Sequence, residues 1–468
     1  MMRTRPIART LVGGAGWVLL ALVVGSLLVA LTSSGWVGLV LGSGGLLAVV
    51  ALVRRLADRG PLLRGRVFWS PLLLAGFAVL VASIRNTALG LLPVRWLALF
   101  LAAAAVLVSL VGLVAHRGKP GAWRSRGLVI VTVLVLVGVL VDGFGAYRTE
   151  EVLAANGEVH LSGRLLVPRG EGPFPAVLFI HGSGAEPGFV SRSMADRMAR
   201  EGMAALTWDK RGTGRSVGGS PRDDYEDLAS DVIAWIGALS SRPDIDGDQI
   251  ALWGWSEGAW VAPLAAEQLG DVAALVLVSP GVEFGETYYY ELGWRIRNAG
   301  FSEAEAEEAI NLRRDINAYY RTGAGRSELF ARLATVQDEA WYRAGVEVGL
   351  LPAALDDVIA PDDPETVAFI ERQDFTLLTS LAEFEGPVLA AFGLQDQCNP
   401  PETGADTVEN ALRSAGNDHR ILRYPEAGHV LLVWLTGERS CGLGIPPFSY
   451  PVGFVDEAAS WLTQSLER

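Results

Sequence analysis

The division of hydrophobicity along the chain constrains its fold more than any other feature of the sequence. The first 147 of the 468 residues contain 14 Lys and Arg but only 2 Asp and Glu, and long apolar stretches separate these charges. Five of these stretches are each close to the length at which a helix crosses a bilayer; they cover residues 11–31, 36–53, 67–84, 96–115 and 128–146. Residues 1–147 therefore predict an all-α membrane domain with about five transmembrane helices.

The first apolar stretch follows Arg3, Arg5 and Arg9, as the hydrophobic part of a cleaved signal peptide would. Its apolar run is too long for a signal peptide and further spans follow it, which favours an uncleaved anchor. No ionisable residue lies near the centre of a span, whereas transport and proton relay usually depend on one. The membrane domain is therefore interpreted as an anchor rather than as a transporter.

The positions of Lys and Arg predict the orientation of the spans. Twelve of the 14 lie in the N-terminus and in two loops, residues 54–66 and 116–127, and only Arg85 and Arg95 lie in the alternate connections. Basic loops remain in the cytoplasm. The N-terminus is therefore expected in the cytoplasm of a multi-pass cell-membrane protein. Five spans place the remaining chain outside the cytoplasm, and the loss of one span would reverse that side.

Residues 148–468 have a different composition, with 25 Lys and Arg against 50 Asp and Glu. Such an acidic region is a poor partner for nucleic acid, because phosphate binding requires clustered basic residues. Short apolar and β-branched runs alternate here with helical patterns, which predicts an α/β domain with a mostly parallel sheet covered on both faces. Strands are expected within residues 158–168, 176–182, 203–209, 249–255, 271–281, 387–396 and 419–429, and helices within 227–242 and 453–468.

Two segments fit the G-x-S-x-G pattern of a nucleophile elbow, "GRSVG" at residues 214–218 and "GWSEG" at residues 254–258. A nucleophile elbow is a sharp turn between a strand and a helix. Ser256 directly follows a predicted strand and precedes a predicted helix. Ser216 lies in a polar, Gly-rich loop that no helix can follow closely. The context therefore predicts Ser256 as the nucleophile.

A serine nucleophile needs a histidine base, and an acid that orients the base. His429 lies just past the last predicted strand, at the carboxyl end where ligands bind in such sheets. The other four histidines fit the role less well: His116, His160, His181 and His419. Asp396 also ends a predicted strand, and it gives the chain order Ser, Asp, His that is typical of such triads. The expected catalytic residues are therefore Ser256, Asp396 and His429.

Acyl transfer also needs hydrogen-bond donors for the oxyanion that forms in the reaction. One expected donor is the backbone N–H of Glu257, the residue after the nucleophile. The second is expected in the turn after residues 176–182, from the N–H of Ser183 or alternatively of Gly184. The Glu257 side chain is interpreted as solvated, with recognition of a cationic substrate as the alternative.

Several motifs together resemble those of a known family. "HGSG", "DKRGTGRS", "GWSEG", "GLQD" and "EAGH" follow one another at residues 181–184, 209–216, 254–258, 393–396 and 426–429. This order is similar to the serine aminopeptidase and dienelactone-hydrolase-like branch of the α/β-hydrolase superfamily, over about residues 150–468. The resemblance implies an α/β-hydrolase sheet, structural roles for Asp209 and Arg211, and a helical cap over about residues 283–385. The N-terminal membrane domain is not part of the family pattern.

The chain contains two cysteines, Cys398 and Cys441, both on the predicted extracytoplasmic side, where disulfides persist. A bond between them would join the acid loop to the base loop, and two independent thiols are the alternative. The sequence contains no Cys/His spacing typical of a metal site and no phosphate or dinucleotide fingerprint. Neither a metal nor another cofactor is predicted.

Together these observations predict a membrane-anchored, extracytoplasmic serine hydrolase that cleaves carboxylic ester bonds through an acyl-enzyme. The short link to the last span suggests lipid or lipophilic ester substrates. A serine peptidase or aminopeptidase acting on small peptides, and an acyltransferase, are alternatives within the enzyme class. A non-catalytic sensor or scaffold with a hydrolase fold is the alternative outside it.

Overall fold

The computed structural model describes residues 146–467, except residues 189–190, 354–357, 359 and 435–447. The chain divides into two compact units, and these residues belong to the unit that comprises Ala88–Gly90 and Phe144–Arg468. The five predicted spans lie outside the described residues, apart from Ala146 at the end of the fifth. Among the described residues, no helix has both the length and the apolar character needed to cross a membrane.

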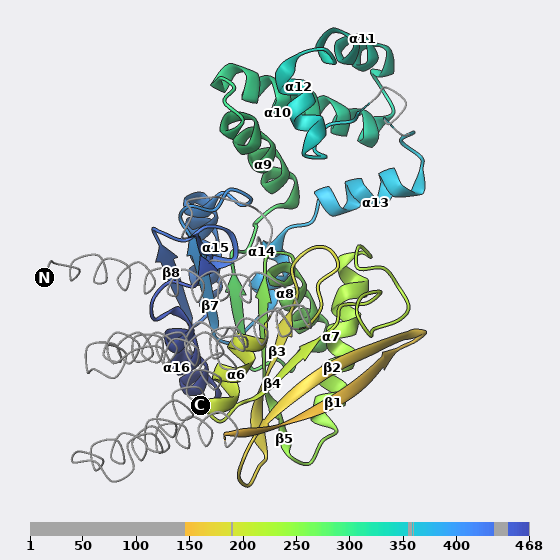
Figure 1. Cartoon of the computed structure of the whole chain (residues 1–468). Helices are drawn as coiled ribbons and strands as arrows, with labels where there is room; N and C mark the ends of the chain where they lie inside the picture. Colours follow the sequence, from red (N-terminus) through yellow and green to blue (C-terminus); the bar gives the residue numbers. More distant parts are fainter. Residues whose placement is uncertain (1–145, 189–190, 354–357, 359, 435–447, 468) are drawn as a thin grey trace, which may run out of the picture. The chain divides into compact units, whose positions relative to one another are not determined.

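An eight-stranded sheet forms the centre of the described domain. Its strands are β1 (Tyr147–Asn156), β2 (Val159–Pro168), β3 (Phe174–Ile180), β4 (Ala204–Trp208), β5 (Ile245–Trp255), β6 (Ala274–Val278), β7 (Val388–Gly393) and β8 (His419–Tyr424). Their spatial order is β1-β2-β4-β3-β5-β6-β7-β8 (Figure 1). The pairs β1–β2 and β2–β4 are antiparallel and all the others are parallel. The prediction of a mostly parallel sheet is confirmed.

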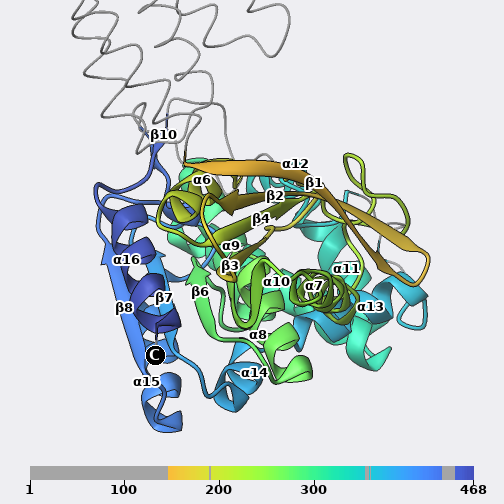
Figure 2. The ribbon, with the colours of Figure 1, turned by 90° about the horizontal axis from the view of Figure 1, so that it is seen from below.

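Strand β1 corrects the sequence analysis, which treated the residues after Ala146 as a short link. Instead, Tyr147–Asn156 pairs with β2 along its whole length, and the hairpin lies along one edge of the sheet (Figure 2). Edge strands commonly carry charged side chains, because these discourage pairing with other chains. The segment "YRTEEVLAAN" is mostly exposed or half-buried, and Leu153 is 77% exposed. Because this segment lacks a clear apolar run, its sequence did not predict a strand.

Helices cover both faces of the sheet, as the alternating pattern predicts. One face packs against α7 (Tyr225–Ser240), α8 (Gly258–Leu269), α14 (Leu377–Glu383) and α15 (Pro401–Ala415), and the other against α6 (Arg192–Arg200) and α16 (Phe454–Leu466). Successive residues of β5 alternate between the two cores: Leu252 belongs to the first and Trp253 to the second. Because both faces are buried, the central strands are apolar throughout.

The segment between β6 and β7 contains the helices of the predicted cap: α9 (Phe284–Asn298), α10 (Glu303–Thr322), α11 (Arg326–Val336), α12 (Ala340–Glu347) and α13 (Pro364–Gln373). Helices α9 to α12 contribute to a hydrophobic core of their own, which includes Leu292, Ile316 and Trp341. Figure 1 shows α9–α13 as a group of helices at one end of the described domain. The last helix of the predicted cap range, α14, instead contributes Leu377 and Leu381 to the core that α7, α8 and α15 form with the first face of the sheet.

Candidate active site

The chain turns sharply between β5 and α8, at Ser256. The backbone of Ser256 has φ 53°, in the left-handed region that non-glycine residues seldom adopt. A Cβ atom on Gly254 would lie 2.0 Å from the carbonyl oxygen of Gly258, and one on Gly258 would lie 2.4 Å from that of Ile180. Both glycines are therefore required by backbone contacts, and the strained turn presents the serine at the carboxyl end of β5.

We expect Gly258→Ala to destabilise the domain by about 3 kcal/mol or more, because the new methyl group would displace backbone atoms and not a flexible side chain. Gly237→Ala in α7 is the matched control. A Cβ at Gly237 has no atom within 4 Å, and alanine in a helix is favoured over glycine by about 1 kcal/mol. Urea unfolding of both variants measures the difference. Equal stabilities would contradict the close approach at the elbow.

Three side chains from distant parts of the chain meet at this turn. His429 Nε2 lies 3.0 Å from Ser256 Oγ, and His429 Nδ1 lies 2.8 Å from Asp396 Oδ2. Ser256 follows β5, Asp396 lies in the loop after β7, and His429 begins a short 3-10 helix after β8. Asp396 is 4% exposed and His429 is 5% exposed. The structure therefore brings together the three residues that the sequence predicted.

The Asp396 carboxylate is oriented by the loop that carries it. Its Oδ1 accepts hydrogen bonds from the backbone N–H groups of Cys398, at 2.7 Å, and Asn399, at 3.0 Å. The Asn399 side chain in turn donates to the carbonyl oxygen of Ser279, at 2.6 Å. Tyr290, in α9, donates its hydroxyl to the Asp396 carbonyl oxygen at 3.0 Å. Oδ2 is thereby directed at His429.

The electrostatic surroundings favour the protonated form of His429. Burial by itself would lower the pKa of this histidine, but the charge of Asp396 and its hydrogen bond raise it, and Glu291 and Glu186 add to that effect. The result is a pKa above the ordinary value of 6.5. With Nδ1 donating to Asp396, the neutral imidazole leaves Nε2 as an acceptor for the Ser256 hydroxyl.

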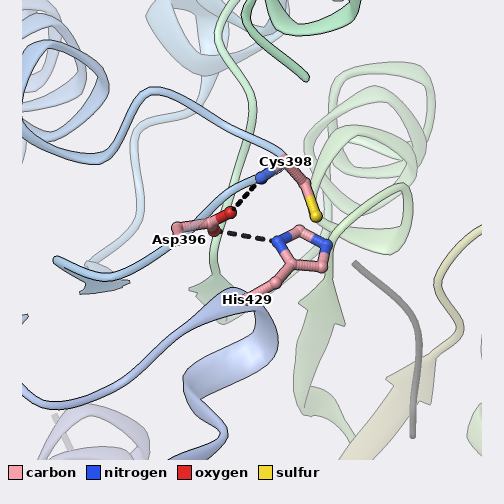
Figure 3. A group of neighbouring side chains, drawn as sticks. All are labelled: Asp396, Cys398 and His429. Carbon is pink, nitrogen blue, oxygen red and sulfur yellow. Dashed lines mark hydrogen bonds and ion pairs between the residues drawn. The ribbon is translucent and has the colours of Figure 1, made fainter. Parts of the chain in front are cut away.

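Asp396, Cys398 and His429 also offer three potential metal-ligand atoms within 4.8 Å of one another (Figure 3). The donor set does not fit a metal ion, because Cys398 is disulfide-bonded and so lacks a thiolate. Both ring nitrogens of His429 are already hydrogen-bonded. Cys441 lies outside the described residues, so the bridge between Cys398 and Cys441 stays a prediction.

Ser216, the other serine in a G-x-S-x-G pattern, has a different environment. Its hydroxyl is buried, accepts a hydrogen bond from the Ser162 N–H at 2.9 Å and donates to the Asp209 carbonyl oxygen. Both partners are backbone groups of neighbouring segments. The Ser216 hydroxyl therefore joins a loop to the sheet.

The expected oxyanion donors lie on two loops that touch each other. A Cβ on Gly258 would meet the carbonyl oxygens of both Ile180 and His181, so the elbow packs against the start of the "HGSG" loop. Among the backbone–backbone hydrogen bonds of the described residues, none is donated by the N–H groups of Ser183, Gly184 or Glu257. These three N–H groups therefore stay the expected donors to the oxyanion.

The Glu257 side chain corrects the expectation that it is solvated. It is only 7% exposed, and its carboxylate is paired with the Lys210 ammonium group, which is 2% exposed. Burial raises the pKa of Glu257, and the charge of Lys210 opposes that shift. Lys210 is not among the site residues expected from the sequence, although it is the only lysine in residues 148–468, which contain 24 arginines. That imbalance is the one sequence signal that marks it.

Asp209 and Arg211 stabilise the loop after β4 through hydrogen bonds. Arg211 donates to both carboxylate oxygens of Asp231, at 2.7 and 2.9 Å, and Asp209 accepts the N–H groups of Gly188 and Arg215, each at 2.9 Å. These contacts agree with the structural roles that the family resemblance implies.

Two of the remaining histidines contact the backbone, and neither is bonded to Ser256. His181 is buried, which lowers its pKa to about 3, and its Nε2 bonds the carbonyl oxygen of Trp208. His419 begins β8 and contacts the Asn417 carbonyl oxygen. His160 is exposed on β2. His116 lies outside the described residues.

Comparison with known proteins is consistent with this geometry. Residues 171–307 match the family described as serine aminopeptidase, S33. The chain is 25% identical over 170 residues to esterase EstD of Thermotoga maritima, and the aligned region covers 35% of this chain and 40% of EstD. It is 29% identical over 140 residues to polyketide transferase ATR5 of Stachybotrys chlorohalonatus, and the aligned region covers 30% of this chain and 44% of ATR5. The chain thus spans about two fifths of the length of these curated relatives.

Among solved structures, an esterase of Pyrococcus furiosus is similar at 16% identity and a TM-score of 0.43, over 69% of this chain and 91% of that one. Acetyl xylan esterase 1 of Thermoanaerobacterium is similar at 16% identity and a TM-score of 0.41, over 68% and 84%. The strand order of the sheet and the sharp turn at Ser256 between β5 and α8 are those of an α/β-hydrolase. The described domain therefore has the α/β-hydrolase fold, and its residues 171–307 are similar to the family described as serine aminopeptidase, S33.

Proposed function

We propose that the domain hydrolyses carboxylic esters, with Ser256 as nucleophile, His429 as general base and Asp396 as the orienting acid. The observation that carries this proposal is the pair of distances that join the three side chains, 3.0 Å from Ser256 Oγ to His429 Nε2 and 2.8 Å from His429 Nδ1 to Asp396 Oδ2. A carboxylate, an imidazole and a hydroxyl in this order activate the hydroxyl for attack on a carbonyl carbon.

In the first half of the reaction, Ser256 Oγ attacks the ester carbonyl while its proton passes to His429 Nε2. The oxyanion is held by the N–H groups of Glu257 and Ser183, with Gly184 as the alternative to Ser183. His429 then returns the proton to the leaving alkoxide, which departs as an alcohol. In the second half, water gives a proton to His429 and attacks the acyl-enzyme, and the acid is released as Ser256 recovers its proton.

The test compares an ester with an amide of the same acyl group, p-nitrophenyl acetate and p-nitroacetanilide. Labelling by a fluorophosphonate shows independently whether Ser256 is activated. Hydrolysis of the ester with a much higher kcat/KM than the anilide supports an esterase, in line with the relatives that are named esterases. Preference for aminoacyl anilides would favour the second candidate, a small-peptide peptidase, which the name of the matched family suggests.

A cavity lies beside the acid loop, and none of its lining residues belongs to the triad or to the expected oxyanion loops. It has a volume of about 460 Å³ and lies between α9, α10 and the first turns of α15. Tyr290 lines it and also bonds the Asp396 backbone. Nine of its thirteen lining residues carry a charge or a hydroxyl group: Glu283, Glu286, Thr287, Tyr289, Tyr290, Arg297, Arg314, Thr403 and Thr407. We propose that the acyl group of the substrate enters this cavity through its side near Tyr290, and its lining fits small polar esters better than a long alkyl chain.

We therefore expect kcat/KM to fall as the acyl chain lengthens, with p-nitrophenyl laurate at least about tenfold poorer than the butyrate, since burying polar groups against an alkyl chain leaves them without hydrogen bonds. Initial rates measured below the micelle-forming concentration of the laurate test this order. A higher kcat/KM for the laurate would instead support the lipid substrates suggested by the membrane anchor.

We also propose that the domain is held at the outer face of the cell membrane by the five N-terminal spans. The support is the distribution of Lys and Arg, twelve on one side and two on the other. A membrane-impermeant fluorophosphonate applied to spheroplasts that contain the full chain tests the side. Labelling before lysis supports an extracytoplasmic domain, and labelling only after lysis reverses the topology.

A sensor or scaffold without catalysis is less favoured, because all three triad residues are present and in contact.

A further inference from the structure

A single buried lysine contacts both loops that carry the expected oxyanion donors. Lys210, in the loop after β4, is 2% exposed. Its ammonium group donates to the carbonyl oxygen of Gly182 at 3.1 Å and pairs with the carboxylate of Glu257. Gly182 directly precedes Ser183, and Glu257 directly follows Ser256. One side chain thus links the "HGSG" loop to the nucleophile elbow.

The contact with Gly182 fixes the direction of the Ser183 N–H. The carbonyl group of Gly182 and the N–H of Ser183 belong to one planar trans peptide, so the two groups point in opposite directions. Lys210 binds the carbonyl side, which turns the N–H away from the lysine. The N–H of Gly182 itself donates to Glu186 Oε2 at 3.0 Å. Both backbone groups of Gly182 are therefore hydrogen-bonded, its carbonyl oxygen to Lys210 and its N–H to Glu186.

The contact with Glu257 holds the second donor. The Glu257 N–H is the expected elbow donor, and its side chain is anchored by the buried ion pair with Lys210. A buried carboxylate without a partner would be strongly unfavourable, so the lysine and the glutamate depend on each other. An ammonium group suits this place because it is a compact charge with three donors, whereas the guanidinium group of arginine is planar and larger.

We propose that Lys210 is a positioning residue for the oxyanion site: it orients the Ser183 N–H through the Gly182 carbonyl and holds the Glu257 N–H through the Glu257 carboxylate. This inference rests on the proposed ester hydrolysis at Ser256. It gives Glu257 a role in holding the elbow, in place of solvation or substrate recognition. It also selects the Ser183 N–H over that of Gly184 as the second donor.

The test begins with Lys210→Met, which keeps the length of the side chain and removes the ammonium group. We expect kcat for p-nitrophenyl butyrate to fall by about a hundredfold, the effect of losing one aligned oxyanion donor, with KM changed less than about threefold. The affinity for a trifluoromethyl ketone, which forms an oxyanion on Ser256, should fall in the same proportion as kcat/KM. An unchanged kcat and ketone affinity would overturn the proposal.

A double variant separates positioning from simple structural support. Lys210→Met combined with Glu257→Met removes both buried charges, so a thermal midpoint that is lowered in the single variant should recover. If Lys210 positions the donors, kcat stays low in the double variant although the midpoint recovers. If kcat recovers together with the midpoint, the pair serves only stability and the proposal is wrong.

Fluorophosphonate labelling of the wild-type chain distinguishes this inference from the proposed function. A wild-type chain that neither reacts at Ser256 nor hydrolyses an ester contradicts both. A wild-type chain that reacts, together with a Lys210→Met variant that is labelled at the same rate, contradicts only the role of Lys210. Labelling of the wild type with slower labelling of the variant supports both.

Discussion

Replacement of Ser256 by alanine is expected to remove ester hydrolysis, with kcat reduced by about 10⁶, the size of effect that loss of a serine nucleophile has in other triad enzymes. The alanine variant lacks the oxygen that attacks the carbonyl carbon, and Asp396 and His429 cannot replace it. Fluorophosphonate labelling should disappear in the same variant. The hydrolysis rate of p-nitrophenyl butyrate and the extent of labelling, measured on the same preparation, test this expectation.

Ser216→Ala is the matched control, because Ser216 lies in the other G-x-S-x-G segment. We expect its kcat and labelling to equal those of the wild type. Its free energy of unfolding should fall by about 1–3 kcal/mol, since the Ser162 N–H and the Asp209 carbonyl oxygen would lose a buried partner. Loss of labelling in Ser216→Ala and not in Ser256→Ala would contradict the assignment of the nucleophile.

The two serines could be told apart from sequence because the difference between them is local. A run of apolar residues before Ser256 and a helical pattern after it are properties of adjacent residues, and the structure has β5 and α8 in those places. The presence of the parallel strands and the positions of Asp396 and His429 past strand ends follow from similarly local patterns. Parallel strands then bring such loop residues to one edge of the sheet.

The features that the sequence analysis missed depend on contacts between distant segments. Lys210 and Glu257 are 47 residues apart, and each would be solvated in isolation. They are buried only because the loop after β4, the "HGSG" loop and the nucleophile elbow contact one another. Strand β1 is another such case, since its exposed and charged residues form a strand only by pairing with β2. Neither feature has a periodic apolar pattern that a sequence could reveal.

Asp396 orients His429 through the hydrogen bond between its Oδ2 and His429 Nδ1. We expect Asp396→Asn to lower kcat/KM for p-nitrophenyl butyrate by about 10⁴, because an amide can stabilise the tautomer of His429 that carries its proton on Nε2. In that tautomer Nε2 points a hydrogen at Ser256 and cannot accept the hydroxyl proton. Asp374→Asn is the matched control: Asp374 is paired with Arg321 at the surface, and its amide variant should keep wild-type activity.

The pH dependence of the Asp396→Asn variant adds a readout that a general loss of structure would not produce. Asp396 is the main group that raises the pKa of His429, so the amide variant should have a lower histidine pKa. Since His429 must be neutral to act as a base, the acid limb of kcat/KM should move to lower pH in the variant. The stability that Asp396 gives to protonated His429 is present below about pH 6.5 and is lost as the pH rises through the raised pKa. The amide variant should therefore lose more stability, relative to the wild type, at pH 6 than at pH 9. An acid limb that stays in place would mean that Asp396 does not control the protonation of His429.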